Sequence, residues 1–276
     1  MSQHTAALLA RLQLAPAVLV SVDQVQGSGP REQGAWMAVF ADGVINTIGG
    51  GHLEYQALAE ARALLQRSAN TSPNHAQDLV LRYALGPALG QCCGGVVHLR
   101  YETVNELSIP SLQQRLKGPQ DAVALFGGGH VGKALVQVLG MLPYQVLWVD
   151  SRDEIFPVQV PPNVVTEHSD PVHAAVGNLS PGTHVLIMSF SHAEDLDVVA
   201  ACLKRQREHH DLGSVGLIGS QTKWATFRHR LEARGFTEND MQQVTCPIGV
   251  PRISGKEPEV IAVAVAAQLL QRRSQA

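Results

Sequence analysis

A glycine loop between residues 127 and 132 carries the clearest chemical signal in the sequence. It reads Gly127-Gly128-Gly129-His130-Val131-Gly132 and matches the pattern G-x-G-x-x-G. In that pattern the first glycine (Gly127) allows a tight turn, the second (Gly129) lets backbone approach a pyrophosphate, and the third (Gly132) lets a helix lie close to a sheet. Asp150 follows about 20 residues downstream, where its carboxylate could accept hydrogen bonds from a ribose. We therefore expect these four residues to bind a nucleotide; a glycine turn that only packs the helix is the alternative.

Two further glycine loops occur in the first fifth of the chain. They read Gly27-Ser28-Gly29-Pro30-Arg31 and Gly49-Gly50-Gly51-His52-Leu53-Glu54. Successive backbone N–H groups in such loops can surround an anion, and an arginine can hold a phosphate with its planar guanidinium group. The candidate cofactor-binding residues of these loops are Arg31, Gly49, Gly50, Gly51, His52 and Glu54. Ordinary turn formation is the alternative for either loop taken alone.

Two adjacent cysteines form the most unusual local sequence, Gln91-Cys92-Cys93-Gly94-Gly95. A disulfide between neighbours would be strained, because its geometry requires well separated Cα atoms. A thiolate of Cys92 or Cys93 could instead bind a soft metal or carry a transferable sulfur. We therefore take both as candidate cofactor and metal ligands, with two small buried residues at a bend as the alternative. Cys202 and Cys246 lie among apolar residues, and we expect them in the core.

A lysine near the start of a predicted helix is the last candidate binding residue. Ser220 can cap a helix over residues 221–234, and Lys223 lies in its first turn. Because this helix follows a strand, Lys223 could face an anion at the edge of the sheet where ligands bind in open α/β folds. A capped helix that only packs is the alternative.

The elements that must position these residues differ between the two halves of the chain. In the first half we expect helices over 4–13 and 51–65, and strands over 18–23, 36–40, 44–48, 78–84 and 95–102. In the second half we expect strands over 123–126, 146–149, 184–189 and 214–218, alternating with helices over 131–141, 194–207, 221–234 and 258–273. Alternation of strand and helix builds a doubly wound parallel sheet. The fold class is therefore α/β, with an N-terminal α/β domain over 1–110 and a Rossmann-like domain over 120–276.

Composition excludes several classes of protein. A net charge of −3 without a basic stripe argues against a nucleic-acid partner. The N-terminus has no pattern of a secretion signal, and the longest apolar run, 260–267, is too short to cross a bilayer. The four cysteines do not form the pattern of a disulfide scaffold, so we expect a reduced, cytoplasmic location without a membrane partner.

Taken together, these motifs resemble the XdhC/CoxI family of molybdenum-enzyme maturation factors over nearly the whole chain. The resemblance rests on the glycine loops at 27–31, 48–54 and 126–132, the segments 91–95, 149–152 and 219–223, and the closing stretches 246–249 and 256–258. Gly29, where alanine is frequent in the family, is a minor departure.

The resemblance implies a maturation chaperone rather than a metabolic enzyme. Such proteins bind molybdenum cofactor (molybdopterin with its metal), protect it from oxidation, help a cysteine desulfurase add its terminal sulfur, and deliver it to an apoenzyme. The expected client is the molybdenum-binding subunit of xanthine dehydrogenase, in purine catabolism, and the expected assembly is a homodimer. Molybdopterin carries a phosphate and a molybdenum centre bound by soft dithiolene sulfur, which suits Arg31, the glycine loops and a thiolate of Cys92 or Cys93.

Two other functions stay open from the sequence. The first is an NAD(P)-dependent oxidoreductase that uses the glycine loop at 127–132, with Arg152 next to a 2′-phosphate and His130 or His192 as acid or base. The second is a Rossmann-like domain that serves only as a platform for docking the client. The nucleotide site could hold NAD, NADP, part of the molybdenum cofactor, or nothing.

Overall fold

The computed structural model describes residues 1–69, 78–85 and 94–273. The chain forms two compact units, one from His4 to Lys117 and one from Gly118 onward, the latter with Met1–Gln3. No helix within these described ranges is long and apolar enough to cross a membrane.

The first unit is built on a five-stranded antiparallel sheet with the order β3-β2-β1-β5-β4. Its elements are α1 (Gln3–Leu12), β1 (Ala17–Gln26), β2 (Trp36–Phe40), β3 (Gly43–Asn46), α2 (Gly51–Ala69), β4 (Leu79–Ala84), β5 (Val96–Val104), the 3-10 helix η2 (Glu106–Ser108) and α3 (Ile109–Arg115).

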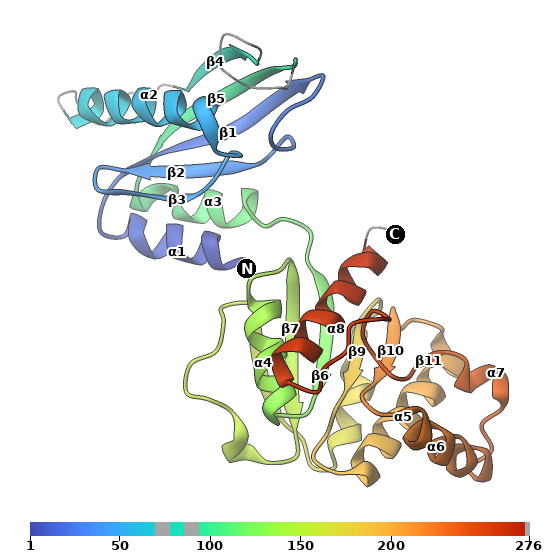
Figure 1. Ribbon diagram of the computed structural model, residues 1–276. Coiled ribbons are helices and arrows are strands. Elements are labelled where there is room, and N and C mark those ends of the chain that lie inside the picture. Colours follow the sequence, from blue (N-terminus) through green and yellow to red (C-terminus); the bar gives the residue numbers. More distant parts are fainter. Residues whose placement is uncertain (70–77, 86–93, 274–276) are drawn as a thin grey trace. The chain divides into compact units, whose positions relative to one another are not determined.

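Both faces of this sheet are covered by helices, so that the central strand β1 is buried on both sides. Val18 and Val20 pack in the core on the side of α2, which contributes Leu53 and Ala57. Leu19 points to the opposite face and packs with residues of α1 and α3. Alternation of side chains along a strand explains this division. The result is a three-layer unit with α2 on one face and α1 with α3 on the other (Figure 1).

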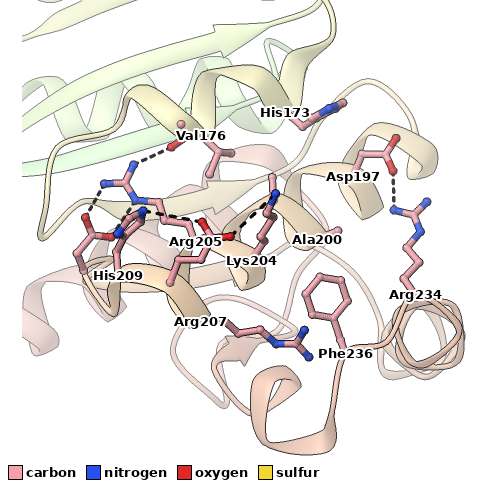
Figure 2. A pocket seen from close by; sticks show the side chains of 14 residues that line it. His173, Val176, Asp197, Ala200, Lys204, Arg205, Arg207, His209, Arg234 and Phe236 are labelled. Atoms are coloured by element: carbon pink, nitrogen blue, oxygen red, sulfur yellow. Dashed lines mark hydrogen bonds and ion pairs between the residues drawn. The ribbon is translucent and has the colours of Figure 1, made fainter.

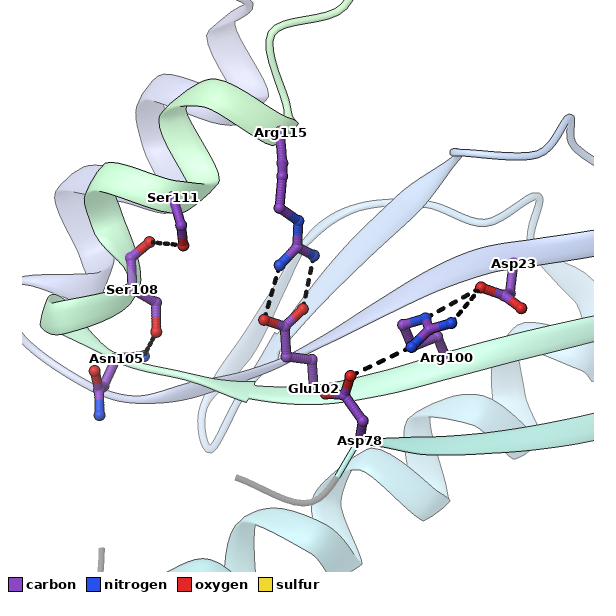
Figure 3. Close-up of polar contacts among 8 residues, drawn as sticks. All are labelled: Asp23, Asp78, Arg100, Glu102, Asn105, Ser108, Ser111 and Arg115. Carbon is purple, nitrogen blue, oxygen red and sulfur yellow. Dashed lines mark hydrogen bonds and ion pairs between the residues drawn. The ribbon is translucent and has the colours of Figure 1, made fainter. Parts of the chain in front are cut away.

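The helix α3 was not expected from the polar composition of residues 103–121. Its one fully buried side chain, Leu112, packs in the same core as α1. Arg115 at its end forms a bidentate ion pair with Glu102 of β5, at 2.9 and 2.7 Å (Figure 3). Ile109 and Leu116 are partly buried against the same core, and with Leu112 they have the i, i+3, i+7 spacing of one helix face. The pattern is short and lies among polar residues between Pro110 and Gly118, so it was not expected to form a helix.

The second unit is built on a six-stranded sheet in which every neighbouring pair is parallel, with the order β11-β10-β9-β6-β7-β8. Its elements are β6 (Asp121–Phe126), α4 (His130–Gly140), β7 (Tyr144–Asp150), η3 (Asp153–Ile155), β8 (Val164–His168), η4 (Val172–Asn178), β9 (His184–Ile187), α5 (His192–His209), β10 (Ser214–Leu217), α6 (Gln221–Ala233), α7 (Glu238–Met241), β11 (Val244–Thr245) and α8 (Pro258–Arg273). Numbered within the unit, this order is 3-2-1-4-5-6, the order of Rossmann folds. The α/β fold class and the parallel Rossmann-like sheet predicted from the sequence are confirmed.

Helices cover both faces of this sheet as well (Figure 1). Val123 and Leu125 of β6 pack with α4 and α8, whereas Ala124 and Phe126 pack with η4, α5 and α6. The strands β8 and β11 were not expected from the sequence. β11 has only two residues, and most of β8 is exposed, so neither shows the apolar run of a buried parallel strand.

We predict that Leu112→Ala destabilises the first unit by about 2–5 kcal/mol, because it leaves a cavity between α3 and the sheet. The exposed Leu107, in the neighbouring η2, is the matched control, and Leu107→Ala should change stability by less than about 0.5 kcal/mol. Native-state hydrogen exchange of β1 and β2 peptides measures both. Equal protection in the two variants would show that α3 does not contribute to this core.

Candidate functional site

The glycine loop after β6 lies where the strand order of the sheet reverses, between β6 and β9. Gly127 has φ +123°, and a Cβ there would overlap the carbonyl oxygen of Met188, which follows β9. A Cβ on Gly132 would collide with the carbonyl oxygen of Gly127. That oxygen also accepts a hydrogen bond from Trp148 Nε1 at 3.0 Å. These two glycines are therefore required by close packing of backbone, as the G-x-G-x-x-G pattern implies.

Gly129 differs from these two because its surroundings are open. It is the N-cap of α4, has an ordinary φ of −68°, and no atom lies within 4 Å of where a Cβ would be. No side chain caps the helix at this position. The first N–H groups of α4 thus have no side-chain cap from Gly129, and they suit an anionic group of a ligand.

The carboxylate of Asp150 is surrounded by hydrogen-bond donors of the protein itself. Gly128 N donates to Oδ2 at 2.6 Å, and the Arg152 backbone N donates to Oδ1 at 2.9 Å. The Arg152 guanidinium adds two hydrogen bonds, one to each oxygen, at 2.8 and 2.9 Å. Burial disfavours the charged form, but the hydrogen bonds from Arg152 and Gly128 outweigh it and hold the pKa of Asp150 below its ordinary value.

A network of contacts joins the loop after β7 to the loop after β9. The Arg152 guanidinium lies 4.2 Å from the ring centre of Phe190, which is 65% exposed. Ser151 Oγ donates to Glu194 Oε1 at 2.8 Å, and Phe190 N donates to Glu194 Oε2 at 3.1 Å. The two loops that flank the glycine loop are thereby held to each other.

These contacts test the fit of a dinucleotide. The open first turn of α4 fits a phosphate, but the ribose of a dinucleotide needs a free carboxylate acceptor at the end of β7. Here Arg152 occupies both oxygens of Asp150, and the Ile155 side chain lies against Gly128. In the arrangement described, a ribose would have to displace Arg152.

Lys223 forms a buried ion pair instead of facing an open site. Its Nζ donates to Asp195 Oδ2 at 2.6 Å and to the Ile218 carbonyl at 2.9 Å, and only 12% of its side chain is exposed. The other oxygen of Asp195 accepts a hydrogen bond from Ser189 N at 2.7 Å. Cys246 lies nearby, and burial raises its pKa to about 11, so its thiol is protonated at neutral pH.

In the first unit, the loop at 47–51 encloses a carboxylate of the chain itself. Glu54 Oε2 accepts hydrogen bonds from Ile48 N at 3.0 Å and Gly50 N at 3.1 Å, and also from Thr47 Oγ1. Gly49 N donates to Thr47 Oγ1 at 3.0 Å. All three glycines from 49 to 51 have positive φ, so this conformation requires their freedom. The anion that the donors of this loop surround is the Glu54 carboxylate, and binding of a cofactor anion by these residues stays a prediction.

Arg31 lies beside this loop. A Cβ on Gly49 would come within 2.7 Å of Pro30 Cβ and 3.2 Å of Arg31 Cγ, so the segment 27–31 packs directly on Gly49. The Arg31 guanidinium donates to the adjacent Glu32 and, at 3.4 Å, to the Thr47 carbonyl. His52, one residue after the loop, stacks with the exposed Tyr55 at a ring distance of 6.1 Å.

A third glycine segment reaches the same end of the sheet. A Cβ on Gly95 would overlap the Ser28 carbonyl oxygen, and Gly27 lies close to Gly95 Cα. The structure therefore brings segment 27–31 into contact with both Gly49 and Gly95. The predicted ligands Cys92 and Cys93 lie outside the described residues. Among the described residues, no group of three or more His, Cys, Asp or Glu side chains could hold a metal ion.

Sequence reasoning missed the partners of the predicted residues. Glu194 and Asp195 connect Ser151 and Lys223 to the loop after β9. The sequence did carry a signal for Glu194. Ser191 and Glu194 have the S-x-x-E spacing of a helix N-terminus, and Ser191 Oγ caps α5 by accepting from Glu194 N. Nothing in the sequence indicated that Asp195 would pair with Lys223.

A cavity of about 1080 Å³ lies elsewhere, along the partly exposed side of α5 (Figure 2). Two of its arginine side chains already form hydrogen bonds and ion pairs with groups of the protein. Arg205 donates to Asp211 and to the carbonyls of Val176 and Leu179, and Arg234 pairs with Asp197 at 2.7 Å. It contains none of the residues predicted from the sequence to bind a cofactor.

Comparison with known proteins finds a family match in each of the two units. Residues 123–269 match the XdhC Rossmann domain, and residues 10–83 match the XdhC and CoxI family. The uncharacterized protein YqeB of Escherichia coli (strain K12) is 26% identical over 263 residues, which make up 95% of this chain but only 44% of YqeB. The chain thus spans less than half the length of that relative. A crystal structure described as a xanthine dehydrogenase from Bacillus halodurans has the same fold, with a TM-score of 0.75, 18% identity, and coverage of 100% of this chain and 97% of that one.

We predict that Gly132→Ala destabilises the second unit by about 1–3 kcal/mol, because the added methyl group collides with the Gly127 carbonyl. Gly129→Ala, three residues earlier in open space, should change stability by less than about 0.5 kcal/mol. Urea unfolding followed by tryptophan fluorescence compares them. A neutral Gly132→Ala would mean that the loop and α4 are not held as closely as described.

The contribution of Asp150 to the free energy of unfolding should depend on pH. Because its pKa is lowered on folding, the stabilisation is complete at neutral pH and is lost as the pH falls below about 4 toward the folded-state value. Asp150→Asn should therefore reduce the free energy of unfolding by about 1–3 kcal/mol at pH 7, with a smaller difference from wild type at pH 3. Urea midpoints across this range measure it, with the exposed Asp153→Asn as control. A difference that does not shrink in acid would contradict the assignment.

Proposed function

The chain belongs to the XdhC and CoxI family, and we propose that it carries molybdenum cofactor as cargo to a xanthine dehydrogenase. It would bind the cofactor in the cytoplasm, support its sulfuration by a cysteine desulfurase, and deliver it to the molybdenum-binding subunit of the apoenzyme. We further propose that it acts as a homodimer.

The observation that carries this proposal is the packing of segment 27–31, with Arg31, against Gly49 on one side and Gly95 on the other. Arg31 is held mainly by the adjacent Glu32, in an ion pair whose partner is 71% exposed. Exposed ion pairs contribute at most about 1 kcal/mol. The guanidinium can therefore exchange Glu32 for a phosphate group, with which it forms stronger bidentate hydrogen bonds. A group held in this way is bound and can be released.

Cys92 and Cys93 complete the proposal as the residues that contact the metal or protect its sulfido ligand. This part rests on the sequence and on the resemblance, with Gly94 and Gly95 following directly in the chain. Soft thiolate ligands suit a metal that is already bound by dithiolene sulfur. Which of the two cysteines acts is decided by the experiment below.

An NAD(P)-dependent oxidoreductase is the second candidate, and the Rossmann strand order with its open first turn of α4 favours it. The engagement of Asp150 by Arg152 weighs against a bound ribose in this arrangement. The two functions differ in a simple way: a carrier binds its cargo stoichiometrically, whereas an oxidoreductase binds nicotinamide cofactor and turns over.

We predict that the purified protein binds molybdenum cofactor saturably in an anaerobic titration and transfers it to apo-xanthine dehydrogenase in active form. Arg31→Ala should weaken binding about tenfold or more, because it removes a charge-assisted hydrogen bond to the phosphate. At least one of Cys92→Ala and Cys93→Ala should impair binding or the recovery of sulfurated, active enzyme.

Arg67→Ala is the matched control, since Arg67 is an exposed arginine near the other end of α2. It should leave both binding and transfer unchanged. Failure of the wild-type protein to bind the cofactor would contradict the carrier function. Tight nicotinamide binding with turnover would establish the second candidate instead.

A further inference from the structure

A cavity of about 390 Å³ opens at the carboxyl edge of the second sheet, beyond β10 and β11 and beside the first turns of α8. We propose that it binds a small organic anion with an apolar body. This site is separate from the glycine loops of both units and does not depend on the proposed carrier function.

Three stretches singled out in the sequence, and not used by the proposed function, meet in this cavity. They contribute Gly219 and Ser220 after β10, Pro247 and Ile248 after β11, and Lys256 before α8. These stretches are far apart in the chain, so only the fold brings them together. The cavity lies at the carboxyl edge of the sheet, the edge on which open α/β folds bind ligands, but beyond β10 and β11 and away from the reversal of strand order between β6 and β9.

The lining indicates an apolar ligand body. Six aliphatic side chains surround the cavity: Ile218, Ile248, Val250, Ile253, Val260 and Ile261. Small residues, including Gly219, Gly255 and Ala264, leave the space between them. The volume falls in the range of sites that take small molecules, which are lined mainly by apolar side chains with a few polar groups. An apolar body of one or two rings fits this size.

Lys256 gives the cavity its charge preference. It is the only charged side chain in the lining, and it forms no ion pair with any other residue in the described part of the chain. Ser220 Oγ is already used, because it caps α6 by accepting from Lys223 N at 3.1 Å. The Glu257 carboxylate approaches Gly255 but does not line the cavity. An anionic group next to an apolar ring therefore matches the available chemistry.

The test uses 2-naphthoate as the anionic probe and 2-naphthalenemethanol as its neutral counterpart, added to the full chain labelled at the isoleucine δ1 methyl groups. We expect the signals of Ile218, Ile248, Ile253 and Ile261 to shift on titration with 2-naphthoate. Ile155 beside the glycine loop and the isoleucines of the first unit should not shift. Shifts confined to these other residues, or no shifts, would overturn the site.

Two pairs of variants test the mechanism of binding. Val260→Phe fills the cavity and should weaken 2-naphthoate binding about tenfold, whereas Val263→Phe on the exposed side of the same helix should not. Lys256→Gln should weaken 2-naphthoate binding about three- to fivefold and leave the neutral probe unaffected, with Lys204→Gln as control. Equal losses for both probes would overturn the anion preference, and binding unchanged by Val260→Phe would overturn the site itself.

Discussion

Close approach of backbone segments at glycine positions is the constraint on which both candidate sites depend. In the second unit, Gly127 lies against the Met188 carbonyl and Gly132 against the Gly127 carbonyl, so the β6 loop, the β9 loop and α4 meet without side chains between them. In the first unit, Gly95 lies against the Ser28 carbonyl, and Gly49 against Pro30. Any side chain at Gly95, Gly127 or Gly132 would separate the segments, and the polar groups they bring together would no longer meet.

The two units share a second feature, which is that one glycine loop in each unit donates backbone hydrogen bonds to a carboxylate of its own chain. Ile48 N and Gly50 N donate to Glu54 in the first unit, and Gly128 N donates to Asp150 in the second. Backbone N–H groups held in one place need an acceptor when they are removed from water. These carboxylates satisfy them and so fix the loops in the conformation that a ligand would meet.

Much of this architecture could be predicted from the sequence, because apolar periodicity and glycine patterns are local. The alternation of strands and helices after residue 122 predicts the parallel sheet, and the spacing of Leu53, Ala57 and Ala61 predicts α2. The strand β11 could not be predicted, since it has only two residues and is stabilised by pairing with β10. The helix α3 was missed although Ile109, Leu112 and Leu116 have helical spacing, because the pattern spans only two turns in a polar segment. The same limit holds at the candidate site. The charges of Asp150 and Lys223 indicate from the sequence that they could contact a ligand. That Asp150 pairs with Arg152, and Lys223 with Asp195, is determined by the fold.

The position of Glu54 in the first turn of α2 has a consequence for any anion that binds the loop before it. Its carboxylate is tethered a few residues from the amides of Ile48 and Gly50, so its effective concentration there is in the millimolar range or higher. An incoming anion that accepts hydrogen bonds from these amides must displace the Glu54 carboxylate. Its observed binding free energy is therefore reduced by the free energy of the intramolecular contact that it replaces. If the protein is the carrier proposed above, this built-in competitor lowers the net affinity for the cargo without weakening any single contact to it, and Glu54 takes the amides again once the cargo has left.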